Sequence, residues 1–219
     1  MSEPRAFCLA DRRCIRQDLP ASLRPPERLE WRVAASWSVD PAKLYTIGHS
    51  TRTPEDFIEL LKREGVVHLV DVRAFPTSAR YPHFNQKNLA DRLAQEGIRY
   101  THFPALGGRR KVRRDSHNTL WRNAGFRGYA DYMETREFAE ALDELLMLAA
   151  RERTAIMCAE AVPWRCHRSL ISDAAVGRGA EVFHILDARA EPHRLTSFGR
   201  VDESGRVHYD VAPQSDLFV

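Results

Sequence analysis

The sequence contains no long hydrophobic run and no secretory signal, and both absences narrow what the chain can be. Although 43% of its 219 residues are hydrophobic, no apolar stretch approaches the roughly 18 residues that a membrane-spanning helix needs. Residues 1–20 alternate charges with short apolar pieces and lack the apolar segment of a signal peptide. We therefore expect a cytoplasmic protein without membrane contact, long enough for one domain with extra tails.

Cysteine is scarce, with four residues in the whole chain, at Cys8, Cys14, Cys158 and Cys166. Without a secretion signal these residues do not predict a disulfide framework, and their spacings match no common zinc module. A glycine-rich phosphate loop and a dinucleotide fingerprint are also absent. We therefore expect free thiols and predict no metal site and no bound cofactor.

Lysine is rare, with 4 residues against 29 arginines, and the basic residues are unevenly distributed although the net charge is only +3. Residues 109–122 contain a single acid, Asp115, and six basic side chains. These six are Arg109, Arg110, Lys111, Arg113, Arg114 and Arg122. Such a cluster indicates an anionic partner, either a small molecule that carries phosphate or a nucleic acid. The alternative, to which we give equal weight, is that the chain is simply rich in arginine and that this segment is a solvated loop without a partner.

Short apolar segments alternate with helical patterns from residue 44 onward. Strands are predicted at 44–47, 66–72, 98–103, 154–158 and 181–186, and helices at 54–65, 86–96, 135–149 and 166–177. Thr53 and Pro54 are a helix start signal, and Gly97 is a stop signal. Because strands separated by helices form parallel sheets, we predict an α/β fold with a parallel sheet and helices on both of its faces. The long segment 104–128 is predicted to be irregular.

Two flanking segments lie outside this alternation. Residues 1–43 contain several prolines and no lasting periodicity, so we predict an irregular N-terminal extension. Residues 188–219 form a C-terminal tail, in which 198–201 and 206–211 are expected to pair as a hairpin. The single domain is therefore expected to span residues 44–187.

Polar and titratable residues follow three of the predicted strands. Ligands bind at the carboxyl ends of parallel strands, so we expect these residues to meet at one site. The predicted catalytic residues are His49, Asp71, Cys158, Glu160 and Cys166, and the predicted substrate- or anion-binding residues are Ser50, Arg73, Arg109, Arg110, Arg165, His167 and Arg168. An ordinary histidine titrates near neutrality, which suits His49 to proton transfer. Structural roles, such as an ion pair between Asp71 and Arg73, are the alternative.

The segment from Cys158 to Ser169 contains the most reactive side chains. Cys158 ends a strand, and Cys166 lies at or near the start of the next helix, where the partial positive charge stabilises a thiolate. The order of strand, cysteine, loop, arginine and helix is similar to that of cysteine-dependent phosphatases and sulfurtransferases. In the phosphatase loop, however, five residues separate cysteine and arginine, whereas six separate Cys158 from Arg165, and the loop has no glycine. Two thiols that only pack in the core are the alternative.

Five motifs occur in an order and at spacings that resemble a known family. They are Tyr45–Ser50, Asp71–Arg73, Leu106–Gly108, Tyr129–Met133, and Cys158–Glu160 with Cys166–Arg168. Together they resemble the family described as domain of unknown function 488, over roughly residues 44–187. The resemblance implies a Rossmann-like α/β fold in a bacterial or archaeal protein, and it implies no particular reaction.

Three hypotheses for the function follow. The first is an enzyme, a hydrolase or a transferase, that acts on an anionic, phosphate-bearing or nucleotide-like substrate through the cluster at the strand ends. The second is a nucleic-acid-binding or DNA-repair-associated module whose basic segment 109–122 contacts phosphates. The third and weakest is a metal or redox site formed by Cys158, Cys166 and His167.

Overall fold

A six-stranded sheet forms the centre of the fold in the computed structural model, which describes residues 41–187 and 189–210. Its strands are β1 (Lys43–Gly48), β2 (His68–Asp71), β3 (Arg99–His102), β4 (Thr154–Cys158), β5 (Glu181–Ile185) and β6 (Ala190–Pro192). They lie in the order β3-β2-β4-β1-β5-β6, and only β6 pairs antiparallel. The predicted α/β fold with a parallel sheet is confirmed, with β6 as an antiparallel addition at one edge. Most of the predicted N-terminal extension and the end of the tail lie outside the described residues.

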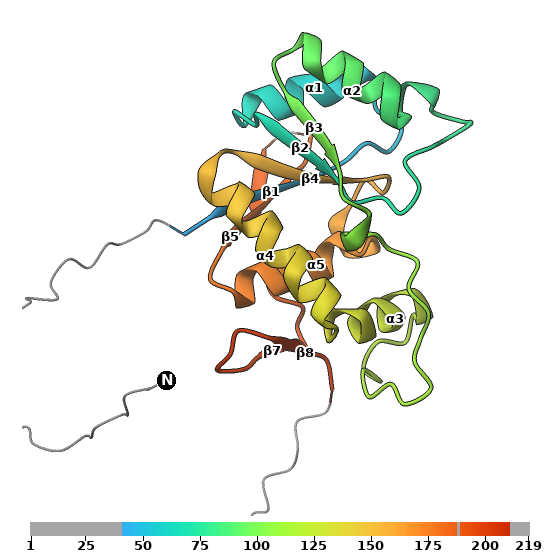
Figure 1. Cartoon of the computed structure of the whole chain (residues 1–219), viewed down its shortest axis with the longest axis vertical. Helices are drawn as coiled ribbons and strands as arrows, with labels where there is room; N and C mark the ends of the chain where they lie inside the picture. Colours follow the sequence, from blue (N-terminus) through green and yellow to red (C-terminus); the bar gives the residue numbers. More distant parts are fainter. Residues whose placement is uncertain (1–40, 188, 211–219) are drawn as a thin grey trace, which may run out of the picture. The chain divides into compact units, whose positions relative to one another are not determined.

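Helices cover both faces of the sheet, as predicted (Figure 1). The helices are α1 (Pro54–Arg63), α2 (Gln86–Gln95), α3 (Ala124–Met133), α4 (Arg136–Arg151) and α5 (Arg168–Gly177). Alternate strand residues point to opposite faces: Leu44 and Ile156 pack in one apolar cluster with α3, α4 and α5, and Ile47 and Met157 pack in another with α1 and α2. None of the helices in the described part of the chain is long and apolar enough to cross a membrane.

Helix α3 is the one α-helix of the described residues that the sequence analysis missed. The segment 104–128 was expected to be irregular throughout, but a helix begins at Ala124, where the Asn123 side chain accepts hydrogen bonds from the N–H groups of Gly125 and Phe126. Glycine weakens helix propensity, which hides this helix in the sequence. A Cβ atom on Gly128 would lie 2.4 Å from the backbone oxygen of Arg110. Gly128 is therefore needed for the close packing of α3 against the chain that precedes it.

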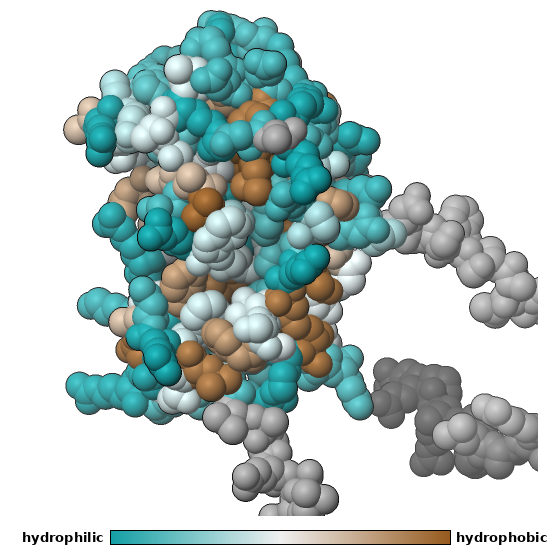
Figure 2. Space-filling model, turned by 180° about the vertical axis from the view of Figure 1, so that it is seen from behind, coloured by the Kyte–Doolittle hydropathy of each residue, from teal (hydrophilic) through white to brown (hydrophobic). Residues whose placement is uncertain are grey.

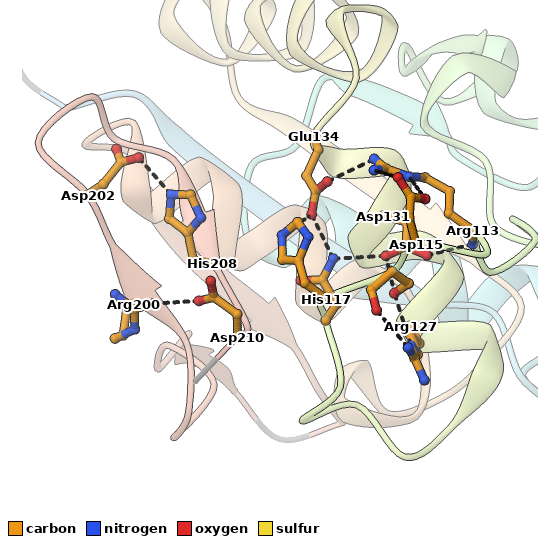
Figure 3. Close-up of polar contacts among 12 residues, drawn as sticks. Arg113, Asp115, His117, Arg127, Asp131, Glu134, Arg200, Asp202, His208 and Asp210 are labelled. Atoms are coloured by element: carbon orange, nitrogen blue, oxygen red, sulfur yellow. Dashed lines mark hydrogen bonds and ion pairs between the residues drawn. The ribbon is translucent and has the colours of Figure 1, made fainter. Parts of the chain in front are cut away.

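The basic segment 109–122 has no regular secondary structure, yet it is held against α3 (Figure 3). Asp131 in α3 is 1% exposed. Its carboxylate accepts hydrogen bonds from the Arg113 backbone N–H at 2.8 Å, the Ser116 hydroxyl at 2.6 Å and the Asn118 amide at 2.9 Å. Glu134, one turn further along, pairs with Arg113 at 2.9 Å. The segment is therefore an anchored loop.

The described part of the tail contains two more short strands, β7 (Arg200–Val201) and β8 (Val207–His208), which pair antiparallel. They lie within the two ranges where the hairpin is expected. A hydrogen bond between His208 and Asp202 and an ion pair between Arg200 and Asp210 link this hairpin internally (Figure 3). The tail is tied to the domain where the Tyr209 hydroxyl donates a hydrogen bond to the buried carboxylate of Asp173 in α5.

The face opposite to the one in Figure 1 is largely hydrophilic, with separate hydrophobic patches (Figure 2). Among the described residues, Phe75 and Trp164 are the most exposed of the large hydrophobic side chains, at 65% and 64%. Phe75 follows β2 and Trp164 follows β4, so both project from loops at the carboxyl edge of the sheet.

Replacing Asp131 with alanine should release the basic loop from α3. Three donors would lose their buried acceptor, so we expect the free energy of unfolding to fall by about 2–4 kcal/mol, and proteolysis within 109–122 to become faster. Denaturant unfolding and limited proteolysis measure the two effects. Glu140→Ala, which breaks an exposed helix pair with Arg136, is the control and should cost less than about 0.5 kcal/mol. Equal effects for the two variants would contradict the anchoring role of Asp131.

Candidate active site

A cleft of about 540 Å³ opens at the carboxyl ends of β1, β2 and β4. The strand register explains its place: Gly48 pairs with Cys158, and Asp71 pairs with Met157, so the loops that follow these strands begin at one level. Seven of the twelve predicted site residues line the cleft, namely His49, Ser50, Arg73, Arg109, Cys158, Glu160 and His167. Ser78, Arg80 and Tyr81 also line it. These three residues lie in the loop that follows β2, and they are not among the site residues predicted from the sequence.

Two thiols and an imidazole meet at the inner end of the cleft. The Sγ atoms of Cys158 and Cys166 are 3.0 Å apart, and Nδ1 of His167 lies 3.5 Å from Sγ of Cys166 and 4.0 Å from that of Cys158. Nε2 of His167 lies 3.1 Å from the backbone oxygen of Val72. Because a carbonyl oxygen only accepts, Nε2–H of His167 donates to Val72, and Nδ1 is the ring atom that faces the two thiols.

The two thiols differ in acidity because of their surroundings. A hydrogen bond from Cys158, assisted by the charge and the backbone N–H of Arg168, lowers the pKa of Cys166 to about 6. Donating that hydrogen bond, together with burial, raises the pKa of Cys158 to about 12. At neutral pH the pair therefore holds one proton and one negative charge between its two sulfur atoms. Cys158 lines the cleft, whereas Cys166 is 4% exposed and lies behind it.

Helix α5 begins two residues later than the sequence analysis predicted, at Arg168 and not at Cys166. The helix starts at Arg168 with His167 as its N-cap residue, so Cys166 precedes the cap and does not lie in the first turn. Its thiolate is stabilised by the neighbouring thiol and by the charge and backbone N–H of Arg168, the first residue of the helix. The prediction that Cys166 lies at or near the start of this helix is confirmed.

Arg168 is a buried cation that does not reach the cleft. It is 1% exposed, and its guanidinium donates to the backbone oxygens of Glu160 at 2.6 Å and Ala161 at 3.3 Å and to the Thr46 hydroxyl at 3.2 Å. No carboxylate within residues 41–187 and 189–210 pairs with it, and its Nε atom has no hydrogen-bond partner there. Arg168 therefore lies beneath the loop that follows β4 and shapes it, instead of clamping a substrate as predicted.

The loop that follows β4 has its backbone oxygens engaged and its N–H groups free. The oxygen of Ala159 accepts from the Ser50 N–H at 2.8 Å, and the next two oxygens accept from Arg168. In the described structure, the N–H groups of residues 159–162 have no protein acceptor. A Cβ atom on Gly48 would lie 1.8 Å from the oxygen of Glu160, so only glycine allows the loop to lie this close to β1. Free backbone donors beside a cysteine are suited to an anion.

A chain of hydrogen bonds runs from Arg168 away from the cleft. The Thr46 hydroxyl lies 2.8 Å from Nδ1 of His184, Nε2 of His184 lies 2.9 Å from Nδ1 of His193, and Nε2 of His193 lies 2.8 Å from Asp173. Arg168 donates to Thr46 at one end of this series, and Asp173 accepts from His193 at the other. Burial lowers the pKa of His184 to about 3, which keeps the ring neutral. The sequence offered no signal for this series of hydrogen bonds, because its two histidines lie far apart from Thr46 in the sequence, His184 in β5 and His193 in the tail.

Asp71 is fully buried beneath the cleft and does not line it. Arg73 pairs with both of its oxygens, through Nε at 2.9 Å and through a terminal nitrogen at 2.5 Å, and the Tyr100 hydroxyl donates at 2.6 Å. Its oxygens are thus occupied, and Asp71 holds Arg73 in place. This is the ion pair that the sequence analysis gave as the alternative to a catalytic role. Arg73 also donates to the backbone oxygen of Phe84 and presents its remaining surface to the cleft.

His49 lines the cleft as a neutral ring. Its Nδ1–H donates to the backbone oxygen of Ser50 at 3.1 Å, and the ring stacks on Phe84 with centroids 4.4 Å apart. Burial, assisted by the charge of Arg73, lowers the pKa of His49 to about 4. The expectation that it titrates near neutrality is therefore wrong, and its Nε2 atom serves as a hydrogen-bond acceptor.

Two predicted anion-binding residues lie away from the cleft. Arg110 donates to the backbone oxygens of Ala105 and Gly107 and lies 3.5 Å above the ring of Tyr132. Arg165 is exposed in the short 3₁₀ helix Pro163–Arg165 and does not contribute to the lining.

By contrast, Arg109 lies at the rim of the cleft, with its guanidinium 5.5 Å from the ring of Phe75. Ser50 and Arg109 are the two non-glycine residues with a positive φ in the described part of the chain, at 47° and 63°. Both line the cleft, and backbone strain of this kind concentrates at functional sites.

Comparisons with known proteins gave one match. A family model described as "Domain of unknown function DUF488" matches residues 53–175, which is more than half of the chain and includes Asp71, Cys158 and Arg168. No curated protein and no solved structure matches.

The lowered pKa of Cys166 predicts a pH-dependent contribution to stability. A thiol whose folded-state pKa is depressed from about 8.5 to about 6 stabilises the fold above the higher value and loses this contribution as the pH falls to the lower one. Unfolding by denaturant should show a stability difference between the wild type and Cys166→Ser that grows by on the order of 2–3 kcal/mol between about pH 6 and about pH 8.5. A difference that is the same at both pH values would contradict the assignment.

Proposed function

The chain belongs to the DUF488 family, and we propose that it is a thiol-dependent group-transfer enzyme or hydrolase that acts on an anionic, phosphate-bearing or nucleotide-like substrate. The observation that carries the proposal is the pair of thiols, whose sulfur atoms lie 3.0 Å apart at the inner end of a cleft with arginines at its rim. The lowered pKa of Cys166 supports it. Two free thiols suit the reducing cytoplasm, where we place the protein.

Cys158 is the nucleophile in this proposal because its sulfur faces the cleft. As Sγ of Cys158 bonds to the electrophilic atom of the substrate, its proton passes to the sulfur of Cys166 or to Nδ1 of His167. The leaving group departs with the electron pair of the broken bond. Water or a second substrate then takes the group from Cys158, and the thiol pair is restored.

The charge of the cleft supports an anionic substrate. Arg80 and Arg109 lie at the exposed rim, whereas the charge of Arg73 is compensated by Asp71. Glu160 is the one carboxylate in the lining among the described residues. The backbone N–H groups of Ala159 and Glu160, which line the cleft, have no protein acceptor there and add donors next to Cys158. This positive field raises the local concentration of anions and their rate of encounter with the thiol. A positive charge of this kind attracts any oxyanion and does not distinguish phosphate from other oxyanions.

A matched pair of alkylating reagents tests the proposal. Iodoacetate and iodoacetamide differ in charge but react alike with a thiolate, so the ratio of their rates at Cys158 reports the field of the cleft. We expect Arg80→Ala and Arg109→Ala each to lower this ratio roughly 3–5-fold at low ionic strength, and high salt to shrink the difference. Peptide mass spectrometry identifies the alkylated cysteine and gives both rates.

Arg136→Ala is the control, because it removes the same charge from an exposed position on α4. It should leave the ratio unchanged. A ratio that does not respond to Arg80 or Arg109, or a Cys158 that neither reagent modifies in the native protein, would contradict the proposed function.

Nucleic-acid binding by the basic loop 109–122 is the second candidate. Its support is the exposed side chains of Lys111, Arg114 and Arg122. It is weaker because two other basic residues of the loop are engaged within the protein, Arg110 with backbone oxygens and Arg113 with carboxylates. A strong salt dependence of oligonucleotide binding would favour this candidate.

A further inference from the structure

A simple group transfer needs one nucleophilic thiol, whereas this site contains two, Cys158 and Cys166. Cys158 faces the cleft, whereas Cys166 is 4% exposed and does not line it. A substrate in the cleft therefore reaches Cys158 first. An adduct on Cys158, by contrast, lies beside Sγ of Cys166, which is 3.0 Å from Sγ of Cys158. The geometry suits the second thiol to attack what the first has captured.

We propose that the pair is a two-electron reductant, and that its substrate is an anion carrying a sulfane sulfur, of the thiosulfonate class. This inference rests on the proposed function, since it takes the cleft as the anion site and Cys158 as the nucleophile. It replaces the phosphate-bearing substrate of that proposal by an anion whose reacting group is a sulfane sulfur, and it adds the fate of the second thiol.

The reaction balances with thiosulfate as the simplest such anion. The Cys158 thiolate attacks the outer sulfur, the sulfur–sulfur bond of thiosulfate breaks, and sulfite leaves with the bonding electrons. Cys158 then carries a persulfide. The Cys166 thiolate attacks the inner sulfur of this persulfide and expels hydrosulfide. In sum, two thiols and one thiosulfate give one disulfide, one hydrosulfide and one hydrogen sulfite, and a dithiol reductant from outside restores the pair.

The position of His167 fits both proton transfers. Its Nδ1 atom lies within 4.0 Å of both sulfurs, and its Nε2–H donates to the backbone oxygen of Val72. The ring can take the proton of Cys158 in the first step, which leaves Cys166 as a thiolate for the second. Closing the disulfide requires the sulfurs to move together by about 1 Å from their present separation.

In a phosphoryl transfer, the thiol of Cys166 would have no chemical role. A phosphoryl group on Cys158 is released by attack at phosphorus, and a thiolate that attacked the sulfur instead would have to expel a reduced phosphorus species. A persulfide, in contrast, is released by attack at sulfur, which is ordinary thiol–disulfide exchange. The adjacent thiols therefore favour a sulfur-bearing oxyanion over a phosphate as the reacting group.

The test uses the full chain, reduced with dithiothreitol, freed of reductant without oxygen, and mixed with thiosulfate. We expect one sulfite and one sulfide per chain, and a protein about 2 Da lighter that contains a Cys158–Cys166 disulfide. Cys166→Ser should release sulfite without sulfide and retain a persulfide on Cys158, about 32 Da heavier. Cys158→Ser should release neither product. The double variant Cys8→Ser, Cys14→Ser should behave as the wild type does.

The outcomes separate this inference from the proposed function. A wild-type persulfide that persists without release of sulfide overturns the role of Cys166, and an unmodified Cys158 overturns the sulfane-sulfur substrate. In both cases the alkylation ratios decide independently whether the cleft is an anion site with a reactive thiol. A stoichiometric metal ion in the purified chain also overturns the inference, since the sulfurs of Cys158 and Cys166 and a nitrogen of His167 lie within 4.8 Å of one another and would be its ligands.

Discussion

The buried guanidinium of Arg168 is the constraint on which the rest of the site depends. An arginine that is 1% exposed and has no carboxylate partner in the described structure needs other compensation for its lost hydration. Backbone oxygens of the loop after β4, the Thr46 hydroxyl and the Cys166 thiolate supply it. The loop is thereby drawn inward, its N–H groups stay free for a ligand, and a negative charge is retained on the thiol pair. One cation thus couples the shape of the loop to the reactivity of the sulfurs.

The parallel sheet explains why these groups meet. Strands β1, β2 and β4 end at the same level, and each end delivers a different element of the site: His49 and Ser50, the Asp71–Arg73 pair, and the thiol segment. Close packing then imposes the local sequence, since Gly48 allows the contact with Glu160. The hydrogen-bond chain through His184 and His193 ties the far side of Arg168 to Asp173 in α5. The cleft is therefore built on rigid elements.

Much of the fold and the place of the site could be predicted from the sequence, because apolar periodicity and the Thr53 and Thr135 caps are local signals. The roles of individual residues could not, since they depend on depth. A strand-end aspartate looks the same in sequence whether it faces a cleft or, like Asp71, lies beneath it. Arg168 appeared as an anion clamp for the same reason. Burial also reversed the expectation for His49, whose ring is kept neutral, and glycines concealed helix α3.

The central claim is that Arg168 and Cys158 keep Cys166 ionised, and the absorbance of thiolate near 240 nm tests it most directly. A pH titration of the folded wild type should show one thiolate per chain appearing with a midpoint near the value of about 6 given for Cys166. That step should disappear in Cys166→Ser, and it should move toward the ordinary cysteine pKa of about 8.5 in Arg168→Gln. A wild-type protein in which every thiol ionises only above pH ~8 would contradict the account.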